Sequence, residues 1–170
     1  MKQSGVNFGQ SKGYSLIAKT LHWGFVGLFA YGVFKQVNDV SELSNSALLR
    51  FEILFAAGFL ILLALRFLYM RFTQTSALPQ STSAWQKLAA KLVHYGLYLS
   101  FGSIAASGLF IGALYSYGVT QGLLMNSVIA LHEASVTASY YLIAVHVLAA
   151  IYHRLLGDRV WSAMVPLWRE

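Results

Sequence analysis

Three histidines lie on one side of the last hydrophobic segment of the chain: His132, His146 and His153. They are 14 and then 7 residues apart, and at about 100° per residue these steps return the side chain to within ~40° and ~20° of the same helical face. The first step also raises the side chain by about 21 Å, most of the ~30 Å apolar thickness of a bilayer. A single buried histidine is most often a packed core residue. Three in register on an apolar helix are better explained by ligand binding, because polar groups inside a membrane are costly and tend to be functional.

The composition is that of a polytopic membrane protein. The chain has 170 residues, of which 57% are hydrophobic and 11% charged, and its mean hydropathy of +0.58 is too apolar for a soluble domain of this size. It contains no cysteine, so disulfides, zinc–thiolate sites, iron–sulfur clusters and covalently attached haem are excluded. Metal chemistry must therefore rest on histidine, carboxylate or methionine side chains.

Four hydrophobic segments are each long enough to cross a bilayer as a helix. They cover residues 15–35, 47–72, 88–115 and 126–156, and a linker rich in Ser, Thr and Gln joins the second to the third. The sequence shows no internal repeat and no second domain. We therefore predict an all-α fold: an integral membrane four-helix bundle that forms a single domain over residues 1–170.

Lysine and arginine predict the orientation of these spans. Only Lys35 and Arg50 lie at the end of the bundle away from the termini. The other ten are Lys2, Lys12, Lys19, Arg66, Arg71, Lys87, Lys91, Arg154, Arg159 and Arg169. By the positive-inside rule, both termini are cytoplasmic. Because the basic residues are spread over helix ends, they favour contact with membrane lipid and give no support to a nucleic-acid partner.

This orientation sorts the histidines by depth. His22, His94, His146 and His153 fall in the cytoplasmic half of the bundle, whereas His132 is alone in the outer half. Two neutral imidazoles that face each other from different helices are the usual axial ligands of a b-type haem. We therefore expect a histidine-ligated haem b.

Two alternatives remain open for these residues. Zinc would need three or four tightly clustered ligands, which the four histidines of the cytoplasmic half would have to supply. Small residues of the first and third spans either make room for a flat macrocycle or simply allow close helix packing. They are Gly24 and Gly27 on the first span and Gly96, Gly102, Ser103, Ser107, Gly108 and Gly112 on the third.

Several segments resemble the bacterial cytochrome b561 family. They are Leu21-His22-Trp23, KLVHYGLY over residues 91–98, LHE over 131–133, YYLIAVH over 140–146, His153, and the Gly-Asp and Met-Val-Pro of residues 157–166. The similarity extends over nearly the whole chain, and the last span carries most of its specificity. Members of this family are multi-pass proteins of the bacterial inner membrane that hold two b haems and exchange electrons with quinone. At least one branch oxidises superoxide and passes the electron to ubiquinone.

The resemblance implies a ligand set for haem. His22 and His146 would be the axial ligands of the iron of the cytoplasmic-side haem. His132 would be the ligand that the last span gives to the iron of the outer haem.

A site for ubiquinone or another quinone would lie at the cytoplasmic rim. The resemblance places His153 there, beside Arg154 and Asp158, and Lys91 and His94 on the third span are further candidates. A quinone carbonyl needs a hydrogen-bond donor, and reduction to quinol needs protons, which a histidine at the membrane surface can relay. The alternative is a cluster that only anchors the helix ends at the membrane interface.

One departure from the family concerns the second span. The family supplies the other outer-haem ligand from a histidine early in this span, but here the span has no histidine. Alignment on Arg66 puts Glu52 at that position, and alignment on a glycine of the span puts Leu54 there. The outer haem would then be absent, five-coordinate through His132, or completed by Glu52. Alternatively, Glu52 pairs with Arg50, or both are ordinary interfacial residues.

The leading functional hypothesis is a membrane b-type cytochrome that transfers single electrons between the quinone pool and a partner or a small oxidant or reductant, which would make it an oxidoreductase. An uncharged outer loop over residues 115–125 suggests as an alternative a membrane anchor subunit whose redox partner docks on the outer side. A superoxide oxidase is a further alternative, weakened because only Lys35 and Arg50 would attract an anion there. A haem-free carrier would use the histidines for protons or metal.

Overall fold

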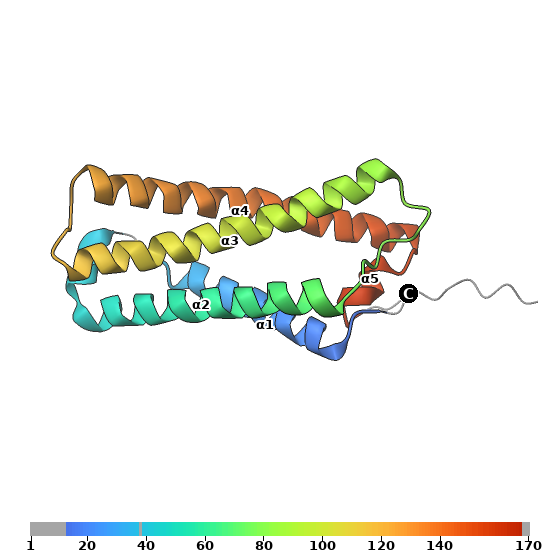
Figure 1. Ribbon diagram of the computed structural model, residues 1–170, viewed down its shortest axis with the longest axis horizontal. Helices are drawn as coiled ribbons and strands as arrows, with labels where there is room; N and C mark the ends of the chain where they lie inside the picture. The colour runs from blue at the N-terminus through green and yellow to red at the C-terminus, as the bar shows by residue number, and fades with distance from the viewer. Residues whose placement is uncertain (1–12, 38, 168–170) are drawn as a thin grey trace, which may run out of the picture.

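The computed structural model describes residues 13–37 and 39–167, and these residues form helices joined by short connections (Figure 1). Four helices are long and apolar enough to cross a membrane. The elements in chain order are α1 (Leu16–Phe34), the 3-10 helix η1 (Val40–Ser44), α2 (Ser46–Thr73), α3 (Ala84–Ser116), α4 (Leu123–Leu156) and α5 (Val160–Met164). The predicted all-α, four-span fold is thus confirmed. Lys2, Lys12 and Arg169, which contribute to the predicted orientation, lie outside the described residues.

Side-chain caps set where the spans begin. Ser15 accepts a hydrogen bond from the backbone of Ala18 at the start of α1, and Asn45 caps α2 in the same way. α3 begins at Ala84, four residues before the predicted start, because Ser83 and Gln86 form a reciprocal capping box, which satisfies two backbone N–H groups at once. α4 begins at Leu123 rather than 126, directly after Gly122, whose φ of 104° favours glycine.

Two short elements were not predicted from the sequence. η1 lies in the connection between α1 and α2, where Asp39 caps it. α5 folds back against α1: the backbone N–H of Tyr14 donates to Ala163 O at 3.2 Å, and the Trp23 indole donates to Met164 O at 3.2 Å. We call the end of the bundle where α1 begins and α4 ends the terminal end, and the opposite end, which holds η1 and residues 117–122, the loop end (Figure 1).

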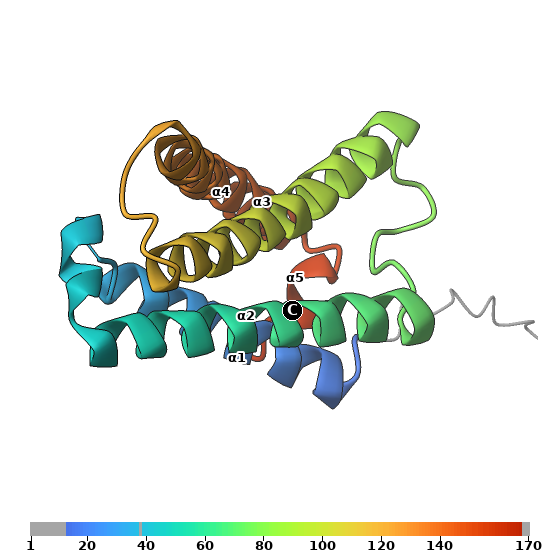
Figure 2. The same cartoon turned by 60° about the vertical axis from the view of Figure 1, so that its left-hand side comes forward.

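The four spans pack in a chain rather than as a closed ring. α1 packs against α2, α2 against α3, and α3 against α4, but within the described residues α1 and α4 make no extensive contact. Figure 2 shows α3 crossing both α2 and α4 at a marked angle. α2 and α3 are therefore the central helices of this arrangement, and α1 and α4 lie at its two edges.

An aromatic cluster forms the centre of the bundle. The rings of Phe25, Phe59 and Phe101, from α1, α2 and α3, lie 4.7–6.2 Å from one another, and all three side chains are buried. Most other apolar side chains of the spans are exposed, as expected for helices whose outer surface meets lipid. The polar residues of the spans are concentrated on either side of this aromatic centre.

Candidate functional site

Three histidines from three helices meet in the terminal half of the bundle. His146 on α4 lies between the other two: its ring centroid is 6.3 Å from that of His22 on α1 and 5.0 Å from that of His94 on α3. The fourth span contributes Arg66, whose Nη2 lies 2.8 Å from Nδ1 of His22. Each span thus gives one polar side chain to this group. We call its three histidines, His22, His94 and His146, the terminal-end histidine cluster, which Arg66 adjoins.

The spacing of His22 and His146 fits an iron atom between them. A metal–imidazole bond is about 2.0 Å long and the ring nitrogen is about 1 Å from the ring centroid, so two trans ligands have centroids about 6 Å apart. The pair His22–His146 matches this at 6.3 Å, whereas His94 and His146, at 5.0 Å and nearly perpendicular, are too close for that arrangement. At this spacing His22 and His146 would be able to hold the iron of a haem, and their assignment as its ligands stays a prediction.

Hydrogen bonds assign different roles to the two rings beside His146. Arg66 is only a donor, so Nδ1 of His22 accepts its hydrogen bond. Nδ1 of His94 instead donates to the backbone oxygen of Ala90 at 2.6 Å, which leaves its Nε2 with a lone pair. Arg66 is also held by two rings, with its guanidinium carbon 5.8 Å from the Phe25 centroid and 5.4 Å from that of Tyr98.

The zinc alternative finds no support in this arrangement. Among the described residues, no group of three or more His, Asp or Glu side chains is placed so as to hold a metal ion. Nδ1 of His22, His94 and His153 is hydrogen-bonded instead to Arg66, to a backbone oxygen and to Asp158, respectively.

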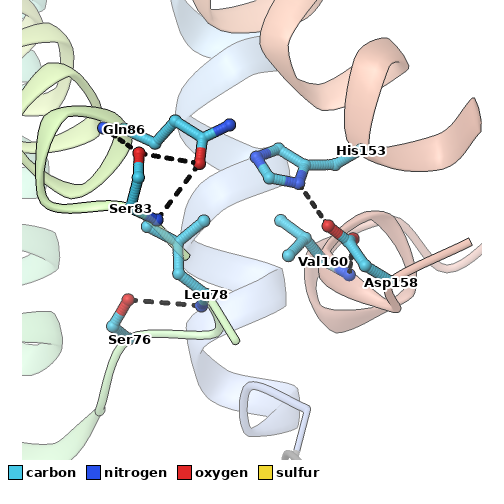
Figure 3. A network of polar contacts seen from close by, with 7 residues as sticks. All are labelled: Ser76, Leu78, Ser83, Gln86, His153, Asp158 and Val160. Atoms are coloured by element: carbon cyan, nitrogen blue, oxygen red, sulfur yellow. Dashed lines mark hydrogen bonds and ion pairs between the residues drawn. The ribbon is translucent and has the colours of Figure 1, made fainter. Parts of the chain in front are cut away.

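Two of the residues predicted to bind quinone, His153 and Asp158, are in contact at the terminal end of the bundle. We call this place the terminal rim. Nδ1 of His153 donates to one carboxylate oxygen of Asp158 at a distance of 2.5 Å. The other carboxylate oxygen accepts from the backbone N–H of Val160 at the start of α5 (Figure 3). Arg154 is half-buried next to this pair, but Lys91 is exposed, and no hydrogen bond or ion pair joins it to His153 within the described residues. His94 belongs to the histidine cluster instead.

A cavity of about 230 Å³ lies in the loop half, between all four spans. We call it the loop-end cavity. Most of its lining is apolar, including Phe29 and Phe59 of the aromatic centre. Its polar lining residues are Gln36, Asp39, Glu52, His132, Glu133 and Tyr140. At its edge, hydrogen bonds from the hydroxyl and backbone N–H of Ser41 lower the pKa of the Asp39 carboxyl below its usual value, so this side of the cavity carries an anion.

The hydrogen bonds of Ser107 fix the proton position on His132. The Ser107 hydroxyl donates to the backbone oxygen of Ser103 at 2.5 Å, and its oxygen lies 3.0 Å from Nδ1 of His132. Because a hydroxyl has one proton to donate, the Ser107 oxygen accepts from Nδ1–H, and Nε2 of His132 keeps its lone pair. This arrangement is typical of histidines that ligate a metal or accept a hydrogen bond through Nε2.

The structure distinguishes between the two alignments of the second span. Glu52 lines the loop-end cavity together with His132, whereas Leu54 is 71% exposed and points away from the bundle. Arg50 is also exposed, and no ion pair between Arg50 and Glu52 occurs in the described part of the chain. One carboxylate oxygen of Glu52 is buried without a hydrogen-bond partner. Glu52 is therefore not an ordinary interfacial residue.

Among the small residues expected to make room, glycines of the third span line the cavity, whereas Gly24 and Gly27 of the first span do not. Gly24 and Gly27 are exposed, with no atom within 4 Å of an added Cβ, so they do not mediate close helix packing among the described residues. Gly108 and Gly112 on α3 line the cavity instead. A Cβ on Gly112 would lie 2.6 Å from Cγ1 of Ile53, so this glycine brings α3 close to α2.

Sequence analysis missed the role of Arg66, although a signal was present. Glu52 and Arg66 are separated by 14 residues on α2, as His132 and His146 are on α4. Both pairs span about 21 Å along one helical face, so each helix gives one residue to the cavity and one to the histidine cluster. A buried arginine in a span is costly enough to indicate a function by itself.

The sequence also matches a known protein family. The family model for prokaryotic cytochrome b561 matches residues 13–167. The chain belongs to the prokaryotic cytochrome b561 family. No curated protein and no solved structure matches the chain. Family membership and the four spans make it a multi-pass membrane cytochrome of the b type, with haem b as the implied cofactor and electron transfer as the implied activity.

Proposed function

We propose that this cytochrome b561 transfers single electrons between the membrane quinone pool and a redox partner through a haem b held by His22 and His146. The observation that carries the proposal is the 6.3 Å separation of these two rings across α1 and α4, the pair of helices that is not packed together. The haem, when bound, supplies the one-electron chemistry. The protein supplies the ligands, an apolar surrounding and the charge of Arg66.

The quinone headgroup is proposed to bind at the terminal rim, beside His153 and Asp158. The carboxylate orients the imidazole through Nδ1, so Nε2 is the atom that exchanges a proton with a quinone oxygen. A ring held in this way suits a residue that passes protons beside a redox site. The side chains of His153 and Asp158 are only 14% and 20% exposed, which supports a role for the pair beyond anchoring at the interface.

We infer that both termini face the cytoplasm and that the protein resides in the bacterial inner membrane, because the basic residues are concentrated at the terminal end. The loop end, with its acidic cavity edge at Asp39 and Glu133, would then face outwards. Negative charge there opposes the approach of an anion such as superoxide. A partner subunit is the better candidate on this side, and the exposed Tyr117 and Leu123 of the uncharged α3–α4 connection offer it an apolar contact.

The proposal is tested with purified protein in nanodiscs. A short-tailed quinol is mixed anaerobically with the oxidised cytochrome, and the α-band of reduced haem b is followed by stopped-flow absorbance. We expect quinol to reduce the haem on the time scale of the stopped-flow experiment. We also expect one haem per chain by pyridine haemochrome assay. A chain purified without haem, or a haem that quinol leaves oxidised while dithionite reduces it, would contradict quinone-linked electron transfer.

A further inference from the structure

We propose that Arg66 binds a propionate carboxylate of the haem b whose iron His22 and His146 would ligate. This inference rests on the proposed function and deepens it, because it names the side chain that would hold the anionic edge of the cofactor. Arg66 would then contact the cofactor directly, in addition to placing a positive charge near the iron.

Arg66 is a cation inside a membrane span and has no anionic partner in the described part of the chain. Its side chain is partly buried, and its Nε is buried without a hydrogen-bond partner. Its one hydrogen bond to a described residue goes from Nη2 to the imidazole of His22. A charged side chain in an apolar surrounding is costly unless it is paired, so the retention of Arg66 favours a ligand that brings negative charge.

The acidic side chains of the chain are placed elsewhere. Four of the six lie in the loop half of the bundle: Asp39, Glu42, Glu52 and Glu133. Asp158 is at the terminal end, but its two oxygens are bonded to His153 and to the backbone of Val160. Glu170 lies outside the described residues. The described chain thus supplies no carboxylate for Arg66, whereas haem b, the implied cofactor, carries two propionates.

Ligation of a haem by His22 would release a second donor of Arg66. With Nε2 of His22 on the iron, the ring proton would be on Nδ1, so Nη2 of Arg66 would lose the acceptor that it has now. Nη2 and Nε lie on the same edge of the guanidinium, and two parallel N–H groups on one edge bind both oxygens of a carboxylate. The buried Nε without a partner and the released Nη2 would together form such an edge.

The position of Arg66 favours a propionate over the phosphate of a lipid. Arg66 is seven residues before the end of α2, about 10 Å along the helix axis, whereas lipid phosphates lie at the membrane surface. It is also in contact with a proposed iron ligand, so an anion on the cofactor is brought to it. The rings of Phe25 and Tyr98 lie 5.8 and 5.4 Å from its guanidinium carbon and hold the cation in place before the cofactor binds.

The test compares haem b with its dimethyl ester, which has the same iron and macrocycle but no propionate charge. The full chain, freed of haem in nanodiscs, is titrated with each compound, and Soret absorbance gives the two dissociation constants. We expect the wild type to bind haem b at least tenfold more tightly than the ester. Arg66→Leu should weaken haem b about tenfold to hundredfold and should bind both compounds with similar affinity. Arg66→Lys, which keeps the charge but not the two-donor edge, should keep part of the difference.

Arg71→Leu is the matched control. Arg71 is on the same helix, but it is exposed and only two residues from the helix end, so its removal should leave both dissociation constants unchanged. Resonance Raman spectroscopy of the haem-loaded protein gives a readout that is independent of affinity. The propionate bending mode should shift in Arg66→Leu and stay in place in Arg71→Leu.

Equal affinities of the wild type for haem b and its ester would overturn the proposal, and this comparison needs no variant to fold. So would an Arg66→Leu variant that keeps the full difference or an unshifted bending mode, because the propionate would then be held by another group, such as a cation at the membrane surface. A failure of the proposed function has a different signature, in which neither compound binds or neither gives a low-spin spectrum.

Discussion

Arg66 on α2 donates a hydrogen bond to Nδ1 of His22 on α1 over 2.8 Å. In the neutral ring this contact puts the imidazole proton on Nε2. A haem held through Nε2 of His22 would need the ring proton on Nδ1, so Arg66 would no longer donate there, while the rings of Phe25 and Tyr98 would keep its guanidinium nearby. The same cation that holds His22 is thus positioned to influence the reduction potential of a haem bound there.

Replacing Arg66 by Leu should lower the midpoint potential of the haem. A cation stabilises the reduced iron, which carries one positive charge fewer, and at an effective dielectric constant near 20 a charge about 7–10 Å away contributes roughly 1.5–2.5 kcal/mol. This corresponds to a decrease of about 70–100 mV for one electron. Arg66→Lys, which keeps the charge, should retain most of the potential. Redox titration followed at the α-band makes the measurement, and equal potentials in wild type and Arg66→Leu would contradict the role given to this side chain.

His146→Ala should abolish the low-spin haem, because it removes one of two axial ligands. His94→Ala is the matched control: its ring lies closer to His146, but it is not placed for an axial bond, so this variant should keep a low-spin spectrum and full haem content. Pyridine haemochrome assay and low-temperature EPR report both quantities. If His94→Ala lost the haem while His22→Ala kept it, the axial pair would have been assigned to the wrong helix.

His153→Leu should slow the reduction of haem by quinol without changing the haem content. Asp158→Asn should act in the same direction, since the carboxylate holds the ring through Nδ1 at 2.5 Å. Lys87, which is bound to the backbone oxygen of Gln80 at the same end of the bundle, provides the control variant Lys87→Gln. Stopped-flow absorbance measures the rate of haem reduction. If His153→Leu and Asp158→Asn both kept the wild-type rate, as the control should, the rim would have no part in quinone chemistry.

We expect one haem per chain in the wild type, because His132 has no imidazole partner on α2. Glu52→His should add a second, low-spin haem, since residue 52 lines the cavity with His132. Leu54→His should not, because side chain 54 is directed outwards. Haem stoichiometry and EPR signals of the two variants make the comparison. Two ordinary bis-histidine signals from the unmodified protein would show that the pairing of helices at the loop end is misassigned.

Gly112→Ala should destabilise the bundle by about 1–3 kcal/mol, the usual cost of overpacking. The new Cβ would lie 2.6 Å from Cγ1 of Ile53, an atom next to its own backbone that has little freedom to move. Gly27→Ala, where an added Cβ meets nothing within 4 Å, should have no such effect. Thermal unfolding in detergent measures both, and the double variant with Ile53→Ala should recover part of the loss if this contact is the cause.

The sequence by itself determined the fold class of this protein, the number of its spans and its family. Hydropathy fixes the four spans because a backbone inside lipid must satisfy its own hydrogen bonds. The 14-residue step from His132 to His146 is a property of helical geometry, so their common face and their separation in depth follow without a structure. The family resemblance, carried mainly by the last span, was confirmed by the match over residues 13–167.

Tertiary structure decided which residues meet across helices. Whether Glu52 or Leu54 faces His132 depends on the rotation of α2 about its axis, which packing against α3 through Gly112 and Ile53 sets. The relative positions of the helices likewise decide three further features. Arg66 contacts His22, Lys91 stays away from the rim, and α1 does not pack extensively against α4. Periodicity describes each helix separately, whereas these contacts arise from the close packing of side chains belonging to different helices.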